Sequence, residues 1–157
     1  MTAIEVRPLR AGDHAAVRAL APELLAGMPD WRPRDGQRAA VQSWVDDTLA
    51  SADQDGHAVF VAVEVTDPDR VLGFVSAGSR KHFSGDSEGY VGELVVDPSC
   101  RRLGIGRSLM AAAQVWITHR GLARISIETG SANTAALAAY ARLGFVTEQV
   151  TLTKSLV

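Results

Sequence analysis

The chain has 157 residues, of which 46% are hydrophobic and 22% are charged, and its formal net charge is −2. This length fits a single domain over residues 1–157, and the composition is typical of a globular protein. One cysteine excludes an intramolecular disulfide framework. Dispersed basic residues argue against a nucleic-acid partner. Neither a membrane-spanning run nor a signal peptide is evident, so we expect a cytoplasmic protein without a membrane partner.

The first third of the chain predicts a strand and two helices. Alternation from Ile4 to Pro8 indicates a short strand, and Asp13 precedes an apolar helical face that Pro22 splits or kinks. Residues 26–36 contain two prolines and two glycines and predict a loop. A second helix follows, and its expected buried face consists of Val41, Trp44, Val45 and Leu49.

The middle of the chain predicts three strands. The valine-rich run 58–65 is typical of a buried strand, and residues 67–69 predict a turn into a second strand over 71–77. Residues 78–89 hold three glycines and several polar side chains, so we expect a loop there. A further strand covers 90–96 and ends before Asp97-Pro98.

The last third alternates helices and strands. An apolar stripe predicts a helix over 104–119, and a short strand follows over 124–128. Asn133 is expected to cap a helix that ends at Leu143, and residues 146–152 predict a final strand. The order β-α-α-β-β-β-α-β-α-β predicts a mixed α/β fold in which helices cover one sheet.

A glycine-bearing basic loop separates the strand over 90–96 from the next helix. The first turn of a helix presents free N–H groups and a positive dipole end, which together bind a pyrophosphate. Gly104 and Gly106 remove side chains that would keep phosphates away, and Arg101, Arg102 and Arg107 add positive charge. The sequence therefore predicts an anion-binding site at this helix start.

Two well-known phosphate loops do not fit this segment. A Walker loop needs Gly-Lys followed by Ser or Thr after four spacer residues, and the segment lacks that pattern. A dinucleotide-binding turn needs a third glycine where this chain has Leu109. The remaining alternative is the Arg-x-x-Gly-x-Gly loop of acyl-CoA enzymes.

Three segments in order carry a family resemblance. Residues 93–110, 127–133 and 138–145 resemble the cofactor-binding half of the GNAT superfamily of N-acetyltransferases, while the N-terminal half agrees only in element order. The resemblance implies a GNAT-like central mixed sheet with splayed fourth and fifth strands and about four flanking helices. It also implies acetyl-CoA as cosubstrate. The four histidines show no metal-ligand spacing, so we expect no metal.

The resemblance assigns cofactor contacts residue by residue. The backbones of Leu94, Val95 and Val96 would bind the pantetheine arm like an added strand, and one N–H would polarise the thioester carbonyl. Asn133 would touch the same arm, although asparagine is equally expected there as a helix cap. The pyrophosphate would lie on Arg101, Arg102, Leu103, Gly104, Ile105, Gly106 and Arg107.

Catalytic groups follow from the same resemblance. Tyr140 matches the tyrosine that protonates the departing thiolate, and its alternative role is a core aromatic. Glu93 and Glu128 compete as the general base, with a water chain as a third alternative. Glu93 is favoured because its side chain would point into the cleft if that of Leu94 points away.

The implied reaction is acetyl transfer to a primary amine by direct attack in a ternary complex. We expect a small-molecule acceptor rather than a protein N-terminus or lysine, in a cleft bounded by the loop 28–35 and by residues 80–83. Trp31 either covers that acceptor or folds against its own domain. The alternative function is a non-catalytic acyl-CoA-binding or interaction module of the same fold. An open sheet edge near the last strand would favour a homodimer.

Overall fold

The computed structural model describes residues 3–157. The strands of this part of the chain are β1 (Ile4–Pro8), β2 (His57–Glu64), β3 (Asp67–Lys81), β4 (Ser87–Val96) and β5 (Ile125–Ile127). Its α-helices are α1 (His14–Ala19), α2 (Arg34–Ser51), α3 (Ile105–His119) and α4 (Thr134–Arg142). Short 3-10 helices η1 (Ala11–Asp13), η2 (Ala21–Leu25) and η3 (Pro98–Cys100) connect them.

The strands form one sheet in the order β1-β2-β3-β4-β5. The first three pairings are antiparallel, while β5 pairs with β4 in parallel from Gly89↔Ile125 to Val91↔Ile127. Within the described residues this pairing stops at Val91, although β4 continues to Val96. The predicted mixed sheet with splayed fourth and fifth strands is therefore confirmed.

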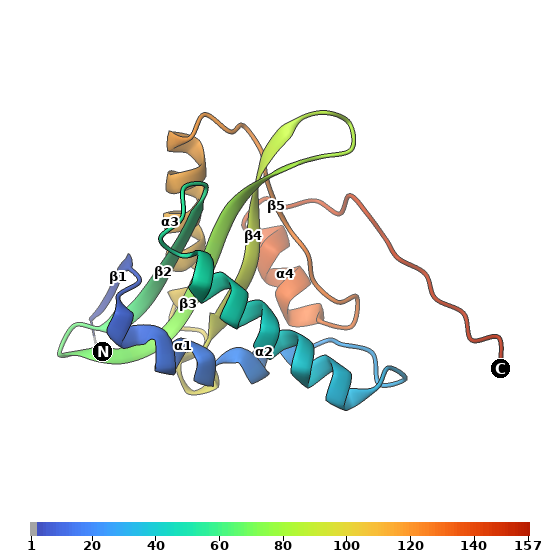
Figure 1. Cartoon of the computed structure of the whole chain (residues 1–157), viewed down its shortest axis with the longest axis horizontal. Helices are drawn as coiled ribbons and strands as arrows, with labels where there is room; N and C mark the ends of the chain where they lie inside the picture. Colours follow the sequence, from blue (N-terminus) through green and yellow to red (C-terminus); the bar gives the residue numbers. More distant parts are fainter. Residues whose placement is uncertain (1–2) are drawn as a thin grey trace.

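Helices cover both faces of the sheet (Figure 1). On the α2 side, Val17, Val45 and Leu49 pack against Phe74 and Val95. On the α3 side, the core residues are Val75, Val91, Leu109, Met110, Ala113 and Ile117. Two separate cores arise because the inner strands alternate apolar side chains between two covered faces. As predicted, the first helix is split near Pro22, which lies in the first turn of η2.

Two predicted connections between strands are in the wrong place. Most of the predicted loop 78–89 is strand, because Gly78 pairs with Tyr90 and Arg80 pairs with Glu88, and the chain turns only over 82–86. Likewise, the turn predicted at 67–69 lies at 65–66, since β3 already begins at Asp67. Pairing across the hairpin overrides the low strand propensity of these polar and glycine residues.

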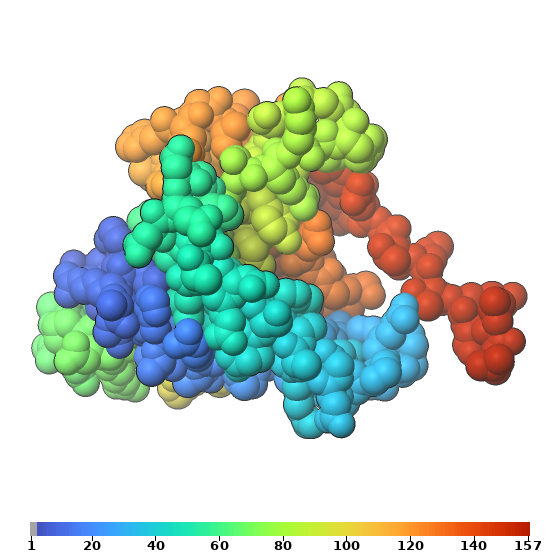
Figure 2. Space-filling model, viewed as in Figure 1, coloured from blue at the N-terminus to red at the C-terminus, as the bar shows by residue number. Residues whose placement is uncertain are grey.

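Two further expectations are corrected, one about a strand and one about a buried side chain. The strand predicted over 146–152 does not form in the described structure. Its segment extends away from the body, with Val146, Val150 and Leu152 exposed (Figure 2). An alternating pattern makes a strand only where a neighbour supplies hydrogen bonds. Trp44 is 47% exposed rather than part of the core, because it lies on a flank of α2 beside the buried stripe Val41, Val45 and Leu49.

A buried ion pair joins β1 to the first helical turn. Arg7 donates to both carboxylate oxygens of Asp13, at 2.7 and 2.9 Å, and also to the Pro68 carbonyl at 3.1 Å. Asp13 additionally accepts from the Arg10 backbone N–H at 2.7 Å. The hydrogen bond from Arg7 holds the pKa of Asp13 below its usual range. This pair ties β1, η1 and the start of β3 together.

We expect Asp13→Asn to lower the free energy of unfolding by about 3 kcal/mol, because it leaves the buried Arg7 guanidinium without a counter-charge. Urea denaturation at pH 7 measures this loss. The exposed pair Arg18–Asp46 supplies the control, and Asp46→Asn should cost at most about 1 kcal/mol. Because the pKa of Asp13 is depressed in the folded protein, the difference in the free energy of unfolding between Asp13→Asn and wild type should shrink as the pH falls through that pKa. Equal losses in both variants would contradict the assignment.

Candidate active site

The predicted anion loop connects β4 to α3 and is shaped by two left-handed residues. Asp97 accepts a hydrogen bond from the Ser99 backbone N–H at 2.8 Å and so starts η3. Arg102 then adopts φ 66° and Gly104, the residue that caps α3, adopts φ 79°. Buried Ile105 anchors the helix start in the α3-side core. The first N–H groups of α3 have no partner within the helix.

The surface over this loop is open enough for a phosphate. Residues 101–104 are exposed, and a Cβ added at Gly104 would meet nothing within 4 Å. At Gly106 an added Cβ would contact only the Val96 side chain, at 3.7 Å. Arg101 does not lie free over the loop, since its guanidinium donates to Glu23 at 2.6 Å. The loop thus offers an exposed backbone cradle with adjacent cations, and its residues fit a pyrophosphate group.

The free edge of β4 lies next to this loop. Leu94, Val95 and Val96 pair with β3 on one side, opposite Val75, Phe74 and Gly73. Their other side faces the opening left where β5 departs after Val91. An unpaired strand edge carries N–H and C=O groups that bind an extended chain as a further strand would. The structure therefore places the three predicted arm-binding residues on a suitable edge.

A β-bulge in β4 decides which face Glu93 occupies. Val75 pairs with Leu94 and Ala77 pairs with Val91, so two β4 residues, Gly92 and Glu93, oppose the single residue Ser76. Strand residues alternate between faces, and one extra residue reverses the faces that follow. Because of the bulge, Glu93 joins the α2 face. Leu94 packs against the α3-side core. It therefore points away from Glu93, which was the condition for the predicted orientation of Glu93.

Glu93 is a buried carboxylate held by two hydroxyl groups. Only 6% of the residue is exposed, and the Thr48 hydroxyl of α2 lies 3.1 and 3.0 Å from its two oxygens. The Ser76 hydroxyl accepts from the Glu93 backbone N–H at 2.9 Å and donates to its carboxylate. Burial raises the pKa of Glu93, and the two hydroxyls oppose that rise only in part. A carboxylate whose pKa is raised is a stronger base than an exposed one.

Tyr140 approaches β4 from the other face. It lies on α4 and, like Leu94 and Val96, packs against the α3-side core, and its ring centroid is 5.8 Å from that of Phe145. Burial raises the pKa of its hydroxyl. Tyr140 therefore stays protonated at neutral pH and can act as an acid. Glu93 and Tyr140 thus lie on opposite faces of the sheet.

Asn133 begins α4 and also joins it to the N-terminal half. As predicted, it is the helix cap, and its side-chain oxygen accepts from the Ala136 backbone N–H at 3.3 Å. Its amide donates to the Ala26 carbonyl at 3.4 Å. Nearby, Gly27 and Gly130 approach so closely that a side chain on either would collide with the other loop. These contacts connect the two walls of the opening at one end.

Glu128 has a different environment from Glu93. Its side chain is 69% exposed, and it accepts from Arg80 at 2.8 Å. Arg80 also donates to Glu88 at 2.8 Å and to Ser126 at 3.0 Å, and its guanidinium carbon lies 4.2 Å from the centre of the Tyr90 ring. The hydrogen bond from Arg80 holds the pKa of Glu88 below its usual range. Glu128 is thus part of a surface ion-pair network centred on Arg80.

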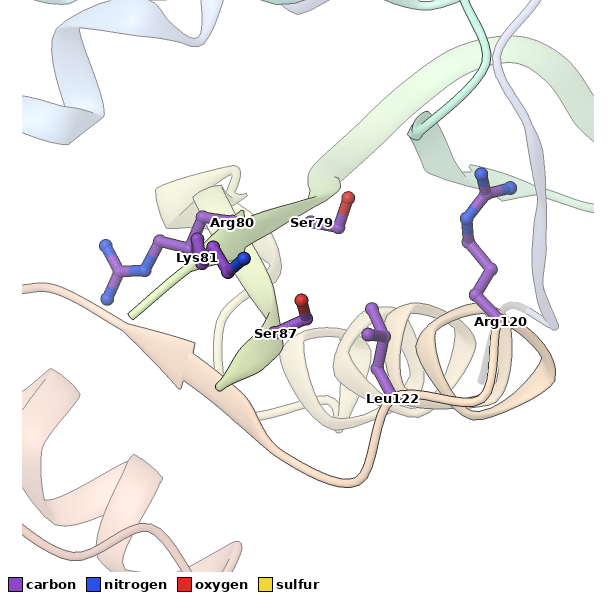
Figure 3. Close-up of a pocket in the computed structure, with 6 residues that line it drawn as sticks. All are labelled: Ser79, Arg80, Lys81, Ser87, Arg120 and Leu122. Carbon is purple, nitrogen blue, oxygen red and sulfur yellow. The ribbon is translucent and has the colours of Figure 1, made fainter. Parts of the chain in front are cut away.

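A hollow lined by basic residues lies elsewhere on the molecule. Figure 3 shows Arg80 and Lys81 on one side, Arg120 on the other, and Ser87 and Leu122 at its floor. Arg80 and Arg120 point in different directions and are already paired, with Glu88 and Asp55 respectively. Ser87 begins the strand that Val96 ends, roughly 30 Å along β4. The hollow is therefore separate from the anion loop.

Sequence reasoning missed the partners of Glu93. Thr48 lies 45 positions before Glu93 and Ser76 lies 17 before it, so no local pattern connects them. Gly92 was an available signal, because an isolated glycine inside a strand indicates a bulge. A Cβ there would meet the Ser76 hydroxyl at 2.8 Å. Trp31, predicted either to cover an acceptor or to pack internally, is 72% exposed.

Comparison with known proteins adds a family to this geometry. The family model described as acetyltransferase (GNAT) family matches residues 21–145. The chain belongs to this acetyltransferase family. The membership confirms the resemblance seen in the sequence, and the expected enzyme class, an acyl-CoA-dependent N-acyltransferase, is that of the GNAT family.

Similar curated proteins are larger than this GNAT chain. A mycothiol acetyltransferase of Rhodococcus erythropolis is 34% identical over 118 residues, covering 73% of the chain and 38% of the relative. A mycothiol acetyltransferase of Kocuria rhizophila is 33% identical over 154 residues, covering 90% and 46%. The chain thus spans less than half the length of these curated relatives.

Solved GNAT structures match nearly the whole fold. An acetyl transferase of Pyrococcus furiosus superposes with a TM-score of 0.77 at 19% identity, covering 98% of this chain and 100% of the other. An aminoglycoside N-acetyltransferase in complex with CoA gives 0.71 at 23% identity, covering 100% and 97%. At these identities the likeness establishes the fold. No helix in the described part of the chain is apolar and long enough to cross a membrane.

The buried Glu93 carboxylate should make the protein less stable as the pH rises. The pKa of Glu93 is higher in the folded than in the unfolded protein, so between these two pKa values the native state retains a proton that the unfolded state has lost. The free energy of unfolding therefore declines as the pH rises from the unfolded pKa through the folded pKa. We therefore expect Glu93→Gln to gain stability relative to wild type as the pH rises from 4 to 8. Urea denaturation across this range measures the difference. Glu5→Gln, at an exposed position, is the control, and a parallel trend in both variants would contradict the assignment.

Proposed function

We propose that the chain transfers the acetyl group of acetyl-CoA to the primary amine of a small molecule by direct attack in a ternary complex. One observation carries this proposal: a buried carboxylate of raised pKa and a protonated tyrosine lie on opposite faces of a sheet that has a free strand edge. Such an arrangement brings a base to the entering amine and an acid to the departing sulfur on the other side. A binding module would need neither group.

The proposed step uses three parts of the chain. Glu93 removes a proton from the acceptor ammonium, and the amine nitrogen then attacks the thioester carbonyl carbon. A backbone N–H at the free edge of Leu94–Val96 stabilises the negative charge that develops on the carbonyl oxygen. The new N–C bond forms as the C–S bond breaks, and Tyr140 gives its proton to the sulfur. The resulting tyrosinate regains a proton from the nitrogen of the new amide, and Glu93 releases its proton to solvent. The products are an acetamide and the free thiol.

Glu93 is the better base of the two candidates. Its raised pKa brings proton affinity toward neutral pH, while Thr48 and Ser76 fix its orientation. Glu128 is mostly exposed and already engaged by Arg80. Proton abstraction by Glu128 would have to compete with that ion pair. We therefore assign Glu128 to the Arg80 network at the margin of the site.

The cosubstrate would bind along the loop and the edge described above. Ile105, Gly106 and Arg107 begin α3 and would donate backbone N–H groups to the pyrophosphate, with Arg101, Arg102 and Leu103 beside them and Gly104 beneath. The arm would extend along Leu94–Val96 toward Asn133. Acetyl-CoA, when bound, supplies the activated acyl group, and the chain supplies orientation and proton transfer.

A small-molecule acceptor is supported by the names of similar proteins, which are mycothiol and aminoglycoside acetyltransferases. We propose that residues 1–157 act as one domain. A cytoplasmic location, a homodimer and the absence of a metal stay predictions. The exposed apolar side chains of the extended segment 146–157 favour the homodimer, because a second copy could cover them.

The decisive experiment is an amine-panel screen for release of free thiol from acetyl-CoA, with mass spectrometry of the products. For an accepted amine, we expect Tyr140→Phe to lower kcat about 100-fold, in the range of acid–base catalysis. Glu93→Gln should lower kcat/KM by a similar factor and remove the acidic limb of its pH profile. Glu128→Gln should retain activity within a few-fold.

Two outcomes would overturn parts of this proposal. Turnover with none of the amines, together with tight acetyl-CoA binding, would favour the binding module. Loss of activity in Glu128→Gln but not in Glu93→Gln would move the base to Glu128.

The phosphate loop has its own test. Gly104→Val should weaken CoA binding at least 10-fold in calorimetric titration, because a branched side chain blocks the phosphate and strains a residue at φ 79°. Gly121, at the other end of α3, has φ 75° and equally open space around its Cβ position. Gly121→Val therefore reproduces the strain without touching the loop. Equal CoA affinity in the two variants would refute the assignment.

A further inference from the structure

An apolar groove lies between α2 and the loop that precedes it. It has a volume of about 310 Å³. Its lining residues are Met28, Pro29, Arg32, Pro33, Gly36, Gln37, Ala40 and Trp44. The loop is held against the helix, because the Gln37 side chain donates to the Pro29 carbonyl at 2.9 Å and the Gln37 backbone N–H donates to the Pro33 carbonyl at 3.1 Å. The groove is therefore a defined feature of the fold.

The groove runs along the flank of α2 that faces Glu93. One flank of α2 faces α1, where Asp46 pairs with Arg18 at 2.8 Å. The other flank carries Thr48, whose hydroxyl contacts the Glu93 carboxylate at 3.0 Å. Trp44 precedes Thr48 by four residues, which places it on the same flank, about 6 Å along the helix axis. A molecule seated against Trp44 would thus lie one helical turn from Thr48, the residue that contacts Glu93.

The chemistry of this flank changes along its length. At the Thr48 end lies a buried proton acceptor, whereas the Trp44 end is a half-exposed indole among Met28, two prolines and Ala40. Its polar side chains are Gln37, which is tied to the loop, and Arg32, whose charge would repel a second cation. An amine at one end, an apolar group at the other and no second ammonium would complement these surfaces.

We propose that the acceptor is a monoamine with an apolar substituent, which packs against Trp44 while its amine reaches Glu93. This inference rests on the proposed function, since it names the substrate class of the same site. Trp44 is then a specificity-determining residue rather than part of the core. Polycationic and polyhydroxylated amines leave the groove unfilled and are poorer acceptors.

A series of n-alkylamines from propylamine to hexylamine tests the proposal by release of free thiol from acetyl-CoA. These amines have nearly equal basicity, so chain length changes only the buried apolar area. We expect kcat/KM to rise about threefold to fourfold per added methylene until the groove is full. 1,6-Diaminohexane should be at least 10-fold poorer than hexylamine because of Arg32. A kcat/KM that does not depend on chain length would overturn the proposal.

Matched tryptophan variants test whether the dependence of kcat/KM on chain length arises at Trp44. Trp44→Ala should flatten the dependence on chain length, while Trp44→Phe should retain part of it. Trp31→Ala is the control, because Trp31 is also exposed and lies in the same loop region but does not line the groove. A flattening in Trp31→Ala equal to that in Trp44→Ala would count against the groove.

A binding measurement separates failure of the inference from failure of the proposed function. Hexylamine should change the tryptophan emission of wild type and leave that of Trp44→Phe unchanged. If no amine is acetylated but this Trp44-dependent change appears, the groove is supported and the catalytic proposal fails. If amines are acetylated without a chain-length effect or an emission change, the catalytic proposal stands and the groove is rejected.

Discussion

Backbone hydrogen bonds between β4 and β5 end at Val91 and Ile127, and the candidate site depends on this parting of two parallel strands. β4 itself stays ordered because β3 pairs with it up to Val96. The other wall is held by the close approach of Gly27 to Gly130 and by the Asn133 amide. An opening with rigid walls and one free strand edge can position an extended ligand without prior rearrangement.

The β4 bulge opposite Ser76 determines which side chains lie near that opening. It moves Glu93 to the α2 face and supplies the hydroxyl that both accepts from its backbone and donates to its carboxylate. Burying a carboxylate in this way opposes stability, which is a recurrent property of functional sites. The same bulge places Leu94 on the α3 face, where Val96 and Tyr140 also pack. One extra residue in a strand thus places the proposed base on the face of the sheet opposite to the proposed acid.

Much of the fold and part of the site could be predicted from local patterns. The split at Pro22, the Asn133 cap and the helix after Gly104 depend on interactions within a few residues, and each is confirmed. Predictions failed where a distant partner decides. Residues 78–81 and 87–89 form strands because they pair with each other. Residues 146–152, equally strand-like in sequence, lie away from the sheet.

The amino-acid sequence by itself determined the order of elements up to α4, the glycine-bearing loop before α3 and the family, because glycine spacing, caps and apolar periodicity are local properties of the chain. Only the tertiary structure decided which face Glu93 occupies, that Thr48 and Ser76 hold it, that Arg80 engages Glu128 and that Trp44 lies in a groove instead of the core. These features join residues that are tens of positions apart. Their physical causes are strand pairing and the packing of α2 on the sheet. Gly92 is a local signal of the bulge, but no short segment of sequence encodes which residues the bulge brings together.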